Sequence, residues 1–185
     1  MAIKPTIYKF NISVSDFNHD YYDSVNLTIA LHPSEKIERM MARVSAYCLN
    51  LHQNANDLMV FTKGLSATEE PDIWIKELDD QITLWIDVGE PSFERVKKSC
   101  RLAKKSYVYS FNSKSTVWWK QVQPQFQGLP VTVVSFDWES VQKLSQSISR
   151  TMEFSVSIND DSLFFSTLNE QHEVSWKLLQ GSLNN

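Results

Sequence analysis

Four charged side chains, spread along the chain, are of the types that metal-dependent phosphodiester chemistry uses: Glu38, Asp72, Asp87 and Lys98. Carboxylate oxygens are the ligands that Mg²⁺ prefers, and the bound ion keeps several waters for chemistry on phosphates. A long cation nearby stabilises the charge that develops on the phosphate. We therefore treat Glu38, Asp72 and Asp87 as candidate ligands of Mg²⁺ or Mn²⁺, and Lys98 as the candidate catalytic cation.

Asp87 lies near the end of an apolar segment of β-forming residues that runs from Ile82 to Val88. A carboxylate at the end of an interior strand is costly to bury unless it is hydrogen-bonded, paired or bound to a metal. The metal hypothesis has one direct alternative: Asp87 caps the helix that follows or pairs with Arg95. The residues alone leave both open.

The other two acids also have ordinary alternatives. Asp72 follows Pro71 and precedes Asp87 by fourteen intervening residues. On the residues alone a solvated loop acid fits it better than a metal ligand, and Asp80 is a rival for the place of second acid. Glu38 lies on a predicted helix, off its apolar stripe, where a surface acid with a local partner is the alternative.

A basic helix is predicted over residues 92–105, with six cationic side chains between Arg95 and Lys105. Its Arg95, Lys97, Lys98 and Arg101 form a candidate surface for nucleic-acid phosphates. The alternative is a solvated helix face with no partner.

Composition narrows the class of protein. A chain of 185 residues that is 42% hydrophobic is expected to form one domain over residues 1–185. Its net charge of −4 argues against a surface that binds nucleic acid all over. No run approaches the roughly 18 apolar residues of a membrane span. The N-terminus has no apolar signal segment, so we expect a cytoplasmic protein.

Other chemistry is disfavoured. Cys48 and His52 are four residues apart on one predicted helix, and a structural role fits them better than a nucleophile and base. The four histidines have no spacing typical of zinc, and only two isolated cysteines occur, so we expect no structural zinc. No phosphate-binding glycine motif is present.

Apolar periodicity and turn residues predict the elements that must position these side chains. Strands are predicted at residues 6–14, 21–31, 58–62, 82–88, 106–111, 131–136, 152–158, 162–166 and 173–178. Helices are predicted at residues 33–52, 92–105, 113–123 and 138–148, and residues 68–76 as a loop or one short helix. Helices and strands that alternate in this way predict a mixed α/β or α+β domain, with a central mixed sheet flanked by helices.

Several segments, in the same order, resemble the YaeQ family of bacterial proteins. They are His32-Pro-Ser-Glu35, Glu38-Arg-Met-Met41, Leu84-Trp-Ile-Asp-Val-Gly89, Trp118-Trp119 and Arg150-Thr-Met152. The resemblance spans essentially the whole chain. It implies a variant of the PD-(D/E)XK nuclease-like fold, in which a helix Glu, a Pro-Asp acid and an acid two residues before a Lys bind Mg²⁺ for phosphodiester hydrolysis.

On this resemblance Glu38 is the helix acid, Asp72 the Pro-Asp acid and Asp87 the strand acid. Gly89 stands where the family pattern has Lys, so Lys98 of the next helix becomes the candidate cation. The hypothesis is a Mg²⁺-dependent nuclease or phosphodiesterase, with the Val88 carbonyl as a further ligand. The alternative is an inactive module of the same fold that binds nucleic acid or protein. Substrate, partner and oligomeric state stay open.

Overall fold

Ten strands and four α-helices make up residues 4–63 and 68–183, the part of the chain that the computed structural model describes. The strands are β1 (Thr6–Asp16), β2 (Tyr21–Leu31), β3 (Met59–Phe61), β4 (Ile73–Lys76), β5 (Ile82–Val88), β6 (Ala103–Ser110), β7 (Val131–Phe136), β8 (Thr151–Asn159), β9 (Ser162–Ser166) and β10 (Gln171–Gln180). The helices are α1 (Ile37–Asn50), followed by the 3₁₀ turn η1 (Leu51–Gln53), then α2 (Phe93–Leu102), α3 (Ser115–Phe126) and α4 (Trp138–Gln146). This architecture confirms the mixed α/β prediction.

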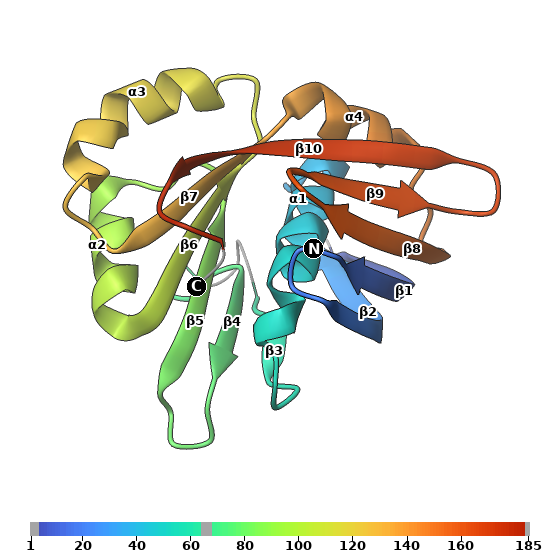
Figure 1. The fold of residues 1–185 in the computed structure, drawn as a ribbon, viewed down its shortest axis with the longest axis horizontal. Helices are drawn as coiled ribbons and strands as arrows, with labels where there is room; N and C mark the ends of the chain where they lie inside the picture. The colour runs from blue at the N-terminus through green and yellow to red at the C-terminus, as the bar shows by residue number, and fades with distance from the viewer. Residues whose placement is uncertain (1–3, 64–67, 184–185) are drawn as a thin grey trace.

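All ten strands join one mixed sheet in the order β2-β1-β8-β9-β10-β7-β6-β5-β4-β3. The sheet bends into two halves, and the long strand β10 crosses from one half to the other (Figure 1). Its first part, residues 171–175, pairs with β9, and its second part, residues 176–180, pairs with β7.

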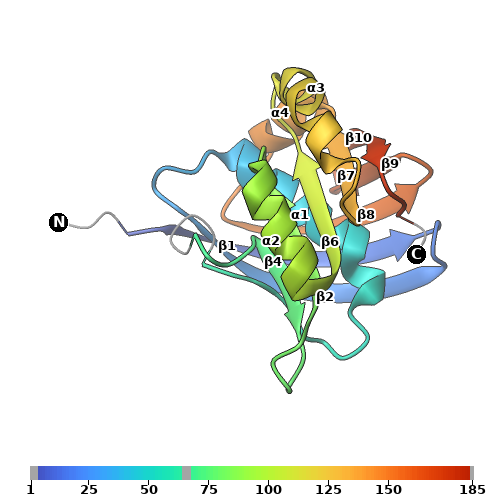
Figure 2. The same cartoon turned by 90° about the vertical axis from the view of Figure 1, so that its left-hand side faces the viewer.

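Helix α1 lies between the two halves of the sheet, where it packs against β5 and α4 (Figure 1). Eleven of its fourteen residues are buried, so it forms the centre of the larger hydrophobic core. Helices α2 and α3 lie together on the β6 side of the molecule (Figure 2), with a smaller core around Val96, Trp119 and Phe126. The N-terminal end of α1 is thereby held beside the ends of β4 and β5.

Most predicted elements are confirmed, including the β1–β2 hairpin, which pairs from Thr6 with Leu31 to Asp16 with Tyr21. Residues 131–136 and 162–166 are strands with the predicted bounds. No helix among residues 4–63 and 68–183 has the length and apolarity needed to cross a bilayer.

Four predicted elements differ from the structure. Residues 68–76 contain strand β4, because Ile73 and Ile75 are buried against β3 and β5. Helix α1 begins at Ile37 rather than residue 33, since residues 32–35 form a turn closed by the Glu35 N–H and the His32 carbonyl. Helix α2 ends at Leu102, because residues 103–105 pair with β5.

Helix α3 is the fourth difference, because it continues past Gln123 and through Pro124 to Phe126. Proline removes one helical hydrogen bond, but here it stands in the last turn. Trp119 and Phe126 pack edge to face with ring centroids 6.0 Å apart, which holds this turn on the smaller core.

A buried hydrogen bond links α1 to β6: the Asn50 side-chain amide donates to the Tyr109 hydroxyl at 2.7 Å. We expect Tyr109→Phe to keep the stacking on Phe136 but to lower the free energy of unfolding by about 1–2 kcal/mol, because the buried amide loses one of its two acceptors and keeps only the Ala46 carbonyl. Urea denaturation measures this loss. Tyr107→Phe is the control, since its hydroxyl accepts only a 3.5 Å contact from Gln53. Equal losses in the two variants would contradict the assignment.

Candidate active site

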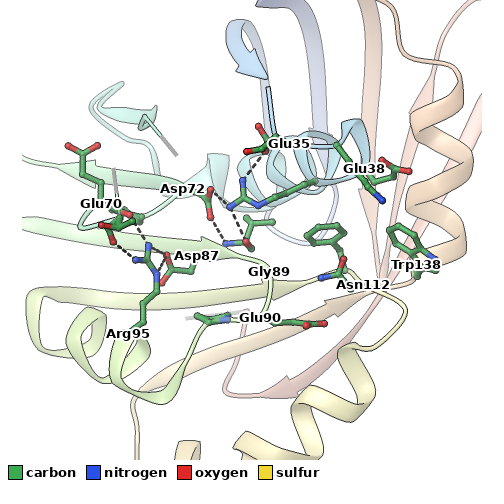
Figure 3. A pocket seen from close by; sticks show the side chains of 18 of the residues that line it. Glu35, Glu38, Glu70, Asp72, Asp87, Gly89, Glu90, Arg95, Asn112 and Trp138 are labelled. Carbon is green, nitrogen blue, oxygen red and sulfur yellow. Dashed lines mark hydrogen bonds and ion pairs between the residues drawn. The ribbon is translucent and has the colours of Figure 1, made fainter. Parts of the chain in front are cut away.

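A cavity of about 720 Å³ lies where the N-terminal end of α1 meets the ends of β4 and β5 and the start of α2. We call it the acidic cleft, because the described residues that line it include six acidic and three basic side chains. These are Glu35, Glu38, Glu70, Asp72, Asp87 and Glu90, with Lys36, Arg39 and Arg95. Three of the four predicted site residues, Glu38, Asp72 and Asp87, therefore lie in one cleft (Figure 3).

Asp72 and Asp87 are brought together by the β4–β5 hairpin. The strands are antiparallel with Ile73 opposite Ile86, and the Asp72 N–H donates to the Ile86 carbonyl at 2.9 Å. The two acids are therefore neighbours at the same end of the hairpin, and each side chain is buried, with 5% and 3% of the residue exposed. Asp80, the rival second acid, lies in the turn at the other end, where it pairs with Lys76.

Asp72 binds a cationic group and a backbone amide. Its Oδ1 accepts from Arg39 Nη2 at 2.7 Å, and its Oδ2 accepts from the Val88 N–H at 2.7 Å. The same Arg39 Nη2 donates to the Val88 carbonyl at 3.2 Å (Figure 3). Two oxygens on neighbouring strands thus converge on one nitrogen of a guanidinium.

Glu35 joins Arg39 to a second buried arginine. Its two carboxylate oxygens accept from Arg39 Nη1 at 2.8 Å and from Arg43 Nη2 at 2.9 Å. Burial lowers the pKa of Arg39, but the ion pairs with Asp72 and Glu35 outweigh it and raise that pKa above its ordinary value. Burial lowers the pKa of Arg43, and Glu35 opposes the change. The sequence analysis did not single out Glu35, Arg39 and Arg43 as site residues, although their spacing of four along the predicted helix is a signal of ion pairing.

Asp87 is paired with Arg95, as the alternative reading predicted. Its Oδ1 accepts from Arg95 Nε at 3.0 Å and Nη2 at 2.6 Å, and its Oδ2 accepts from the Trp85 ring N–H at 3.0 Å. Burial raises the pKa of Asp87, while Arg95 and Trp85 act against the rise and Asp72 adds to it. Arg95 also donates to the Thr68 and Glu70 carbonyls, so it fastens this loop over the acid.

Glu38 lies on the opposite side of the acidic cleft, next to Trp138 (Figure 3). Within residues 4–63 and 68–183 its carboxylate has neither a hydrogen bond nor an ion pair. Among those same residues, Glu38, Asp72 and Asp87 do not bring three ligand atoms within 4.8 Å of one another. One ion in contact with all three would therefore need side-chain movement.

Lys98 is placed away from the acidic cleft. It is exposed on α2 and forms an ion pair with Glu69, and it is not among the described residues that line the cleft. The cations that enter the cleft beside the two buried acids are Arg39 and Arg95. Lys97, also predicted as part of the basic surface, is exposed over the Phe93 ring, and Arg101 is exposed at the end of the same helix.

The backbone at Gly89 explains why this chain has no lysine two residues after Asp87. Its φ is +123°, a backbone conformation that residues with a side chain rarely adopt. The Gly89 N–H donates to the Tyr109 carbonyl at 2.8 Å, which fixes this turn at the end of β5. A lysine two residues after Asp87 is therefore incompatible with the backbone seen here.

The fold and the cleft together define a mixed α/β protein in which buried acids on a β-hairpin are held by arginines from two helices. The model of the family described as YaeQ protein matches residues 1–176, so the chain belongs to the YaeQ family. It is 36% identical over 179 residues to the protein YaeQ of Escherichia coli K12, covering 95% of this chain and 96% of that protein. The YaeQ protein of Salmonella typhi is 35% identical over 178 residues, covering 94% and 95%.

Two crystal structures share the fold. The YaeQ protein from Xanthomonas axonopodis pv. citri gives a TM-score of 0.90 at 29% identity and covers 96% of this chain and 99% of its own. The YaeQ protein from Pseudomonas syringae gives a TM-score of 0.88 at 32% identity and covers 97% and 98%. The overall fold is therefore one that this chain shares with both YaeQ proteins.

Removal of the Glu35 charge tests the arginine network. We expect Glu35→Gln to lower the free energy of unfolding by about 3–5 kcal/mol, because it leaves Arg39 and the buried Arg43 without their shared carboxylate. Glu38→Gln, in the first turn of α1, is the matched control, and we expect a change within about 0.5 kcal/mol. Chemical denaturation measures both. A similar small loss in the two variants would show that the buried pairs contribute little to stability.

Proposed function

We propose that the acidic cleft is the active site of a Mg²⁺- or Mn²⁺-dependent phosphodiester hydrolase acting on nucleic acid. The observation that carries the proposal is the convergence of Asp72 Oδ1 and the Val88 carbonyl on a single cationic nitrogen, with Asp87 as the neighbour of Asp72 on the adjacent strand. Two strands thereby supply oxygens to one cation position at the mouth of a cleft. Oxygen donors of this kind suit a hard divalent ion.

The oxygens of Asp72 and Val88 suit a divalent ion, but the ion can bind them only if Arg39 moves away. Arg39 Nη2 holds the position between Asp72 and Val88, so a metal ion that binds there takes its place. Arg39 is also paired with Glu35 through its other terminal nitrogen, which keeps the guanidinium in the cleft after it leaves Asp72. Asp72, Asp87 and the Val88 carbonyl would hold the ion.

The chain's own residues then have separate tasks in the reaction. A bound divalent ion supplies a water of lowered pKa and a positive charge beside the phosphate. Arg39, once released from Asp72, and Arg95 provide positive charge to the phosphate oxygens. This is the task that the sequence predicts for Lys98. Glu38, which has no partner in the described part of the chain, accepts a hydrogen bond from a water that enters the cleft.

We further propose that this fold is a variant of the PD-(D/E)XK nuclease-like fold. The support is the order of the parts: a helix acid, then Pro71-Asp72 at the start of β4, then Asp87 near the end of β5. Two features depart from the pattern. Gly89 replaces the lysine, and arginines from α1 and α2 replace its charge.

Cleavage assays with matched acid variants test the proposed activity. Purified protein is incubated with supercoiled plasmid, single-stranded DNA and RNA in Mg²⁺ or Mn²⁺. We expect cleavage by the wild type and a loss of about 100-fold or more in Asp87→Asn, because the acid positions the metal directly. Asp80→Asn is the control, since that exposed acid lies at the far end of the same hairpin. Equal background cleavage by wild type and Asp87→Asn would overturn the proposal.

A second candidate function is a module on the same fold that binds nucleic acid without cleaving it. The observation in its favour is that every oxygen of Asp72 and Asp87 already has a donor, from Arg39, Arg95, Val88 or Trp85. In this reading the arginines substitute permanently for a metal. Phosphates would then contact the exposed cations of α2 rather than the acidic cleft.

Binding without metal tests this second candidate. We expect Lys97→Ala combined with Arg101→Ala to weaken binding of a labelled single strand and to reduce its salt dependence, because each lost phosphate contact lowers the salt slope by about 0.7. Fluorescence anisotropy in the presence of a chelator measures this. Lys4→Ala combined with Lys9→Ala, which removes two exposed positive charges near the N-terminal end of the chain, is the charge-matched control. Wild-type binding that the double variant leaves unchanged would exclude the α2 surface.

A further inference from the structure

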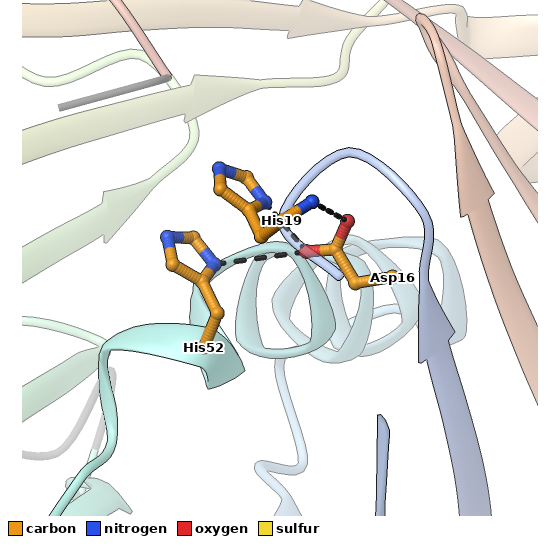
Figure 4. A group of neighbouring side chains, drawn as sticks. All are labelled: Asp16, His19 and His52. Atoms are coloured by element: carbon orange, nitrogen blue, oxygen red, sulfur yellow. Dashed lines mark hydrogen bonds and ion pairs between the residues drawn. The ribbon is translucent and has the colours of Figure 1, made fainter. Parts of the chain in front are cut away.

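Asp16, His19 and His52 form a cluster at the opposite end of α1 from the acidic cleft (Figure 4). Asp16 ends β1, His19 lies in the turn before β2, and His52 lies in η1, directly after α1. Because α1 has fourteen residues, the two sites are separated by about 20 Å along the helix. Sequence spacing had predicted no zinc site, since these residues come together only in the folded chain.

The three side chains each bring one ligand atom close to those of the other two. His19 Nδ1 lies 2.7 Å from Asp16 Oδ2, and His52 Nδ1 lies 3.7 Å from the same oxygen (Figure 4). Within residues 4–63 and 68–183 this is the one group of three or more His, Cys, Asp or Glu residues whose ligand atoms all lie within 4.8 Å of one another.

Neighbouring groups fix the orientation of two of the three side chains. Asp16 Oδ1 accepts from the backbone N–H groups of Asn18 and His19 at 3.0 and 3.3 Å, which leaves Oδ2 facing the rings. His19 Nε2 is 3.2 Å from the Leu183 carbonyl, so the ring is held between this carbonyl and Asp16.

His52 Nδ1 provides a second observation at the same oxygen. It is buried, lies 3.7 Å from Asp16 Oδ2 and has no hydrogen-bond partner among the described residues. A hydrogen bond between His19 and Asp16 satisfies only the first ring, whereas a metal ion uses both.

We propose that Asp16, His19 and His52 bind a borderline divalent transition-metal ion such as Zn²⁺. Two imidazole nitrogens and one carboxylate oxygen are a donor set that suits zinc, and three protein ligands leave a fourth position for water. The site differs in chemistry from the all-oxygen acidic cleft. The Leu183 carbonyl and the Asn18 N–H act as outer partners that orient the ligands.

The electrostatic surroundings favour a bound cation. Asp16 is 1% exposed, and its charge has no arginine or lysine partner in the described part of the chain. The site lies at the C-terminal end of α1, where the helix dipole attracts positive charge.

A metal ion can reach the two histidines, and their rings can move to bind it. The His19 and His52 side chains are 20% and 15% exposed, and His19 also lines a cavity of about 200 Å³ beside Asn18 and Asp160. The two rings stack with centroids 3.6 Å apart and planes at 9°. Both must tilt about the Cβ–Cγ bond to point their lone pairs at one ion.

Metal titration of untagged, chelator-treated protein tests the site. Co²⁺ serves as the spectroscopic probe, and Zn²⁺ then competes for it. We expect one equivalent of Co²⁺ with the visible bands of four-coordinate cobalt, displaced by Zn²⁺. We also expect the melting temperature to rise by about 5–10 °C when free Zn²⁺ is one hundred times its Kd.

Matched variants assign the ligands. We expect His19→Gln and His52→Gln each to weaken Zn²⁺ binding by about tenfold or more. His32→Gln, a histidine outside the cluster that pairs with Ser34, should bind as the wild type does. Asp87→Asn should also bind normally, which separates this site from the acidic cleft. Circular dichroism checks that each variant is folded.

Two results would overturn the inference. One is a wild type with no saturable uptake of Co²⁺ or Zn²⁺, which would leave an ion pair of protonated His19 with Asp16. The other is saturable uptake that neither His19→Gln nor His52→Gln reduces.

Discussion

The acidic cleft depends on ion pairs between buried acids and arginines. Glu35, Arg39 and Asp72 form a continuous chain of alternating charge, and Asp87 is held by Arg95 on the other side. A buried charge without its partner costs several kcal/mol, so these pairs require α1, α2 and the β4–β5 hairpin to be in register together. The interaction that neutralises the acids therefore also sets the shape of the cleft, and any ligand that binds Asp72 has to displace Arg39.

Part of the site was predictable because its signals are local. An apolar strand with an acid near its end predicted Asp87, whereas Asp72 was a candidate on its spacing and on the family resemblance, with no hairpin predicted to join the two. Lys98, by contrast, lies outside the cleft: Arg95 in the first turn of α2 reaches Asp87, whereas Lys98 is exposed and pairs with Glu69. The role of Arg39 was missed because the face of α1 that becomes buried depends on the curvature of the whole sheet. Asp16 and His52 meet only through long-range packing.

The elements of the fold divide in the same way, into those that local residues predict and those that depend on pairing with distant strands. The long alternating strands β1 and β2, and the apolar strand β7, have nearly the bounds that their own residues predict. The short strand β4 was missed, because four residues carry too little pattern, and only pairing with β3 and β5 makes it a strand. The end of α2 shows the same effect: Ala103, Lys104 and Lys105 suit a helix, yet pairing with Ile82 and Leu84 places them in β6.

The course of β10 has a consequence for how the chain assembles. One half of the sheet, β3 to β7, is built from strands close in sequence, so it can form early. The β1–β2 hairpin can join the rest of the sheet only later. Its neighbour β8 begins at Thr151, and the connection to β7 is completed by residues 176–180. Contacts between such distant segments slow folding, since a large loop must close before they form. The N-terminal hairpin therefore keeps an unpaired edge until nearly the whole polypeptide has been made.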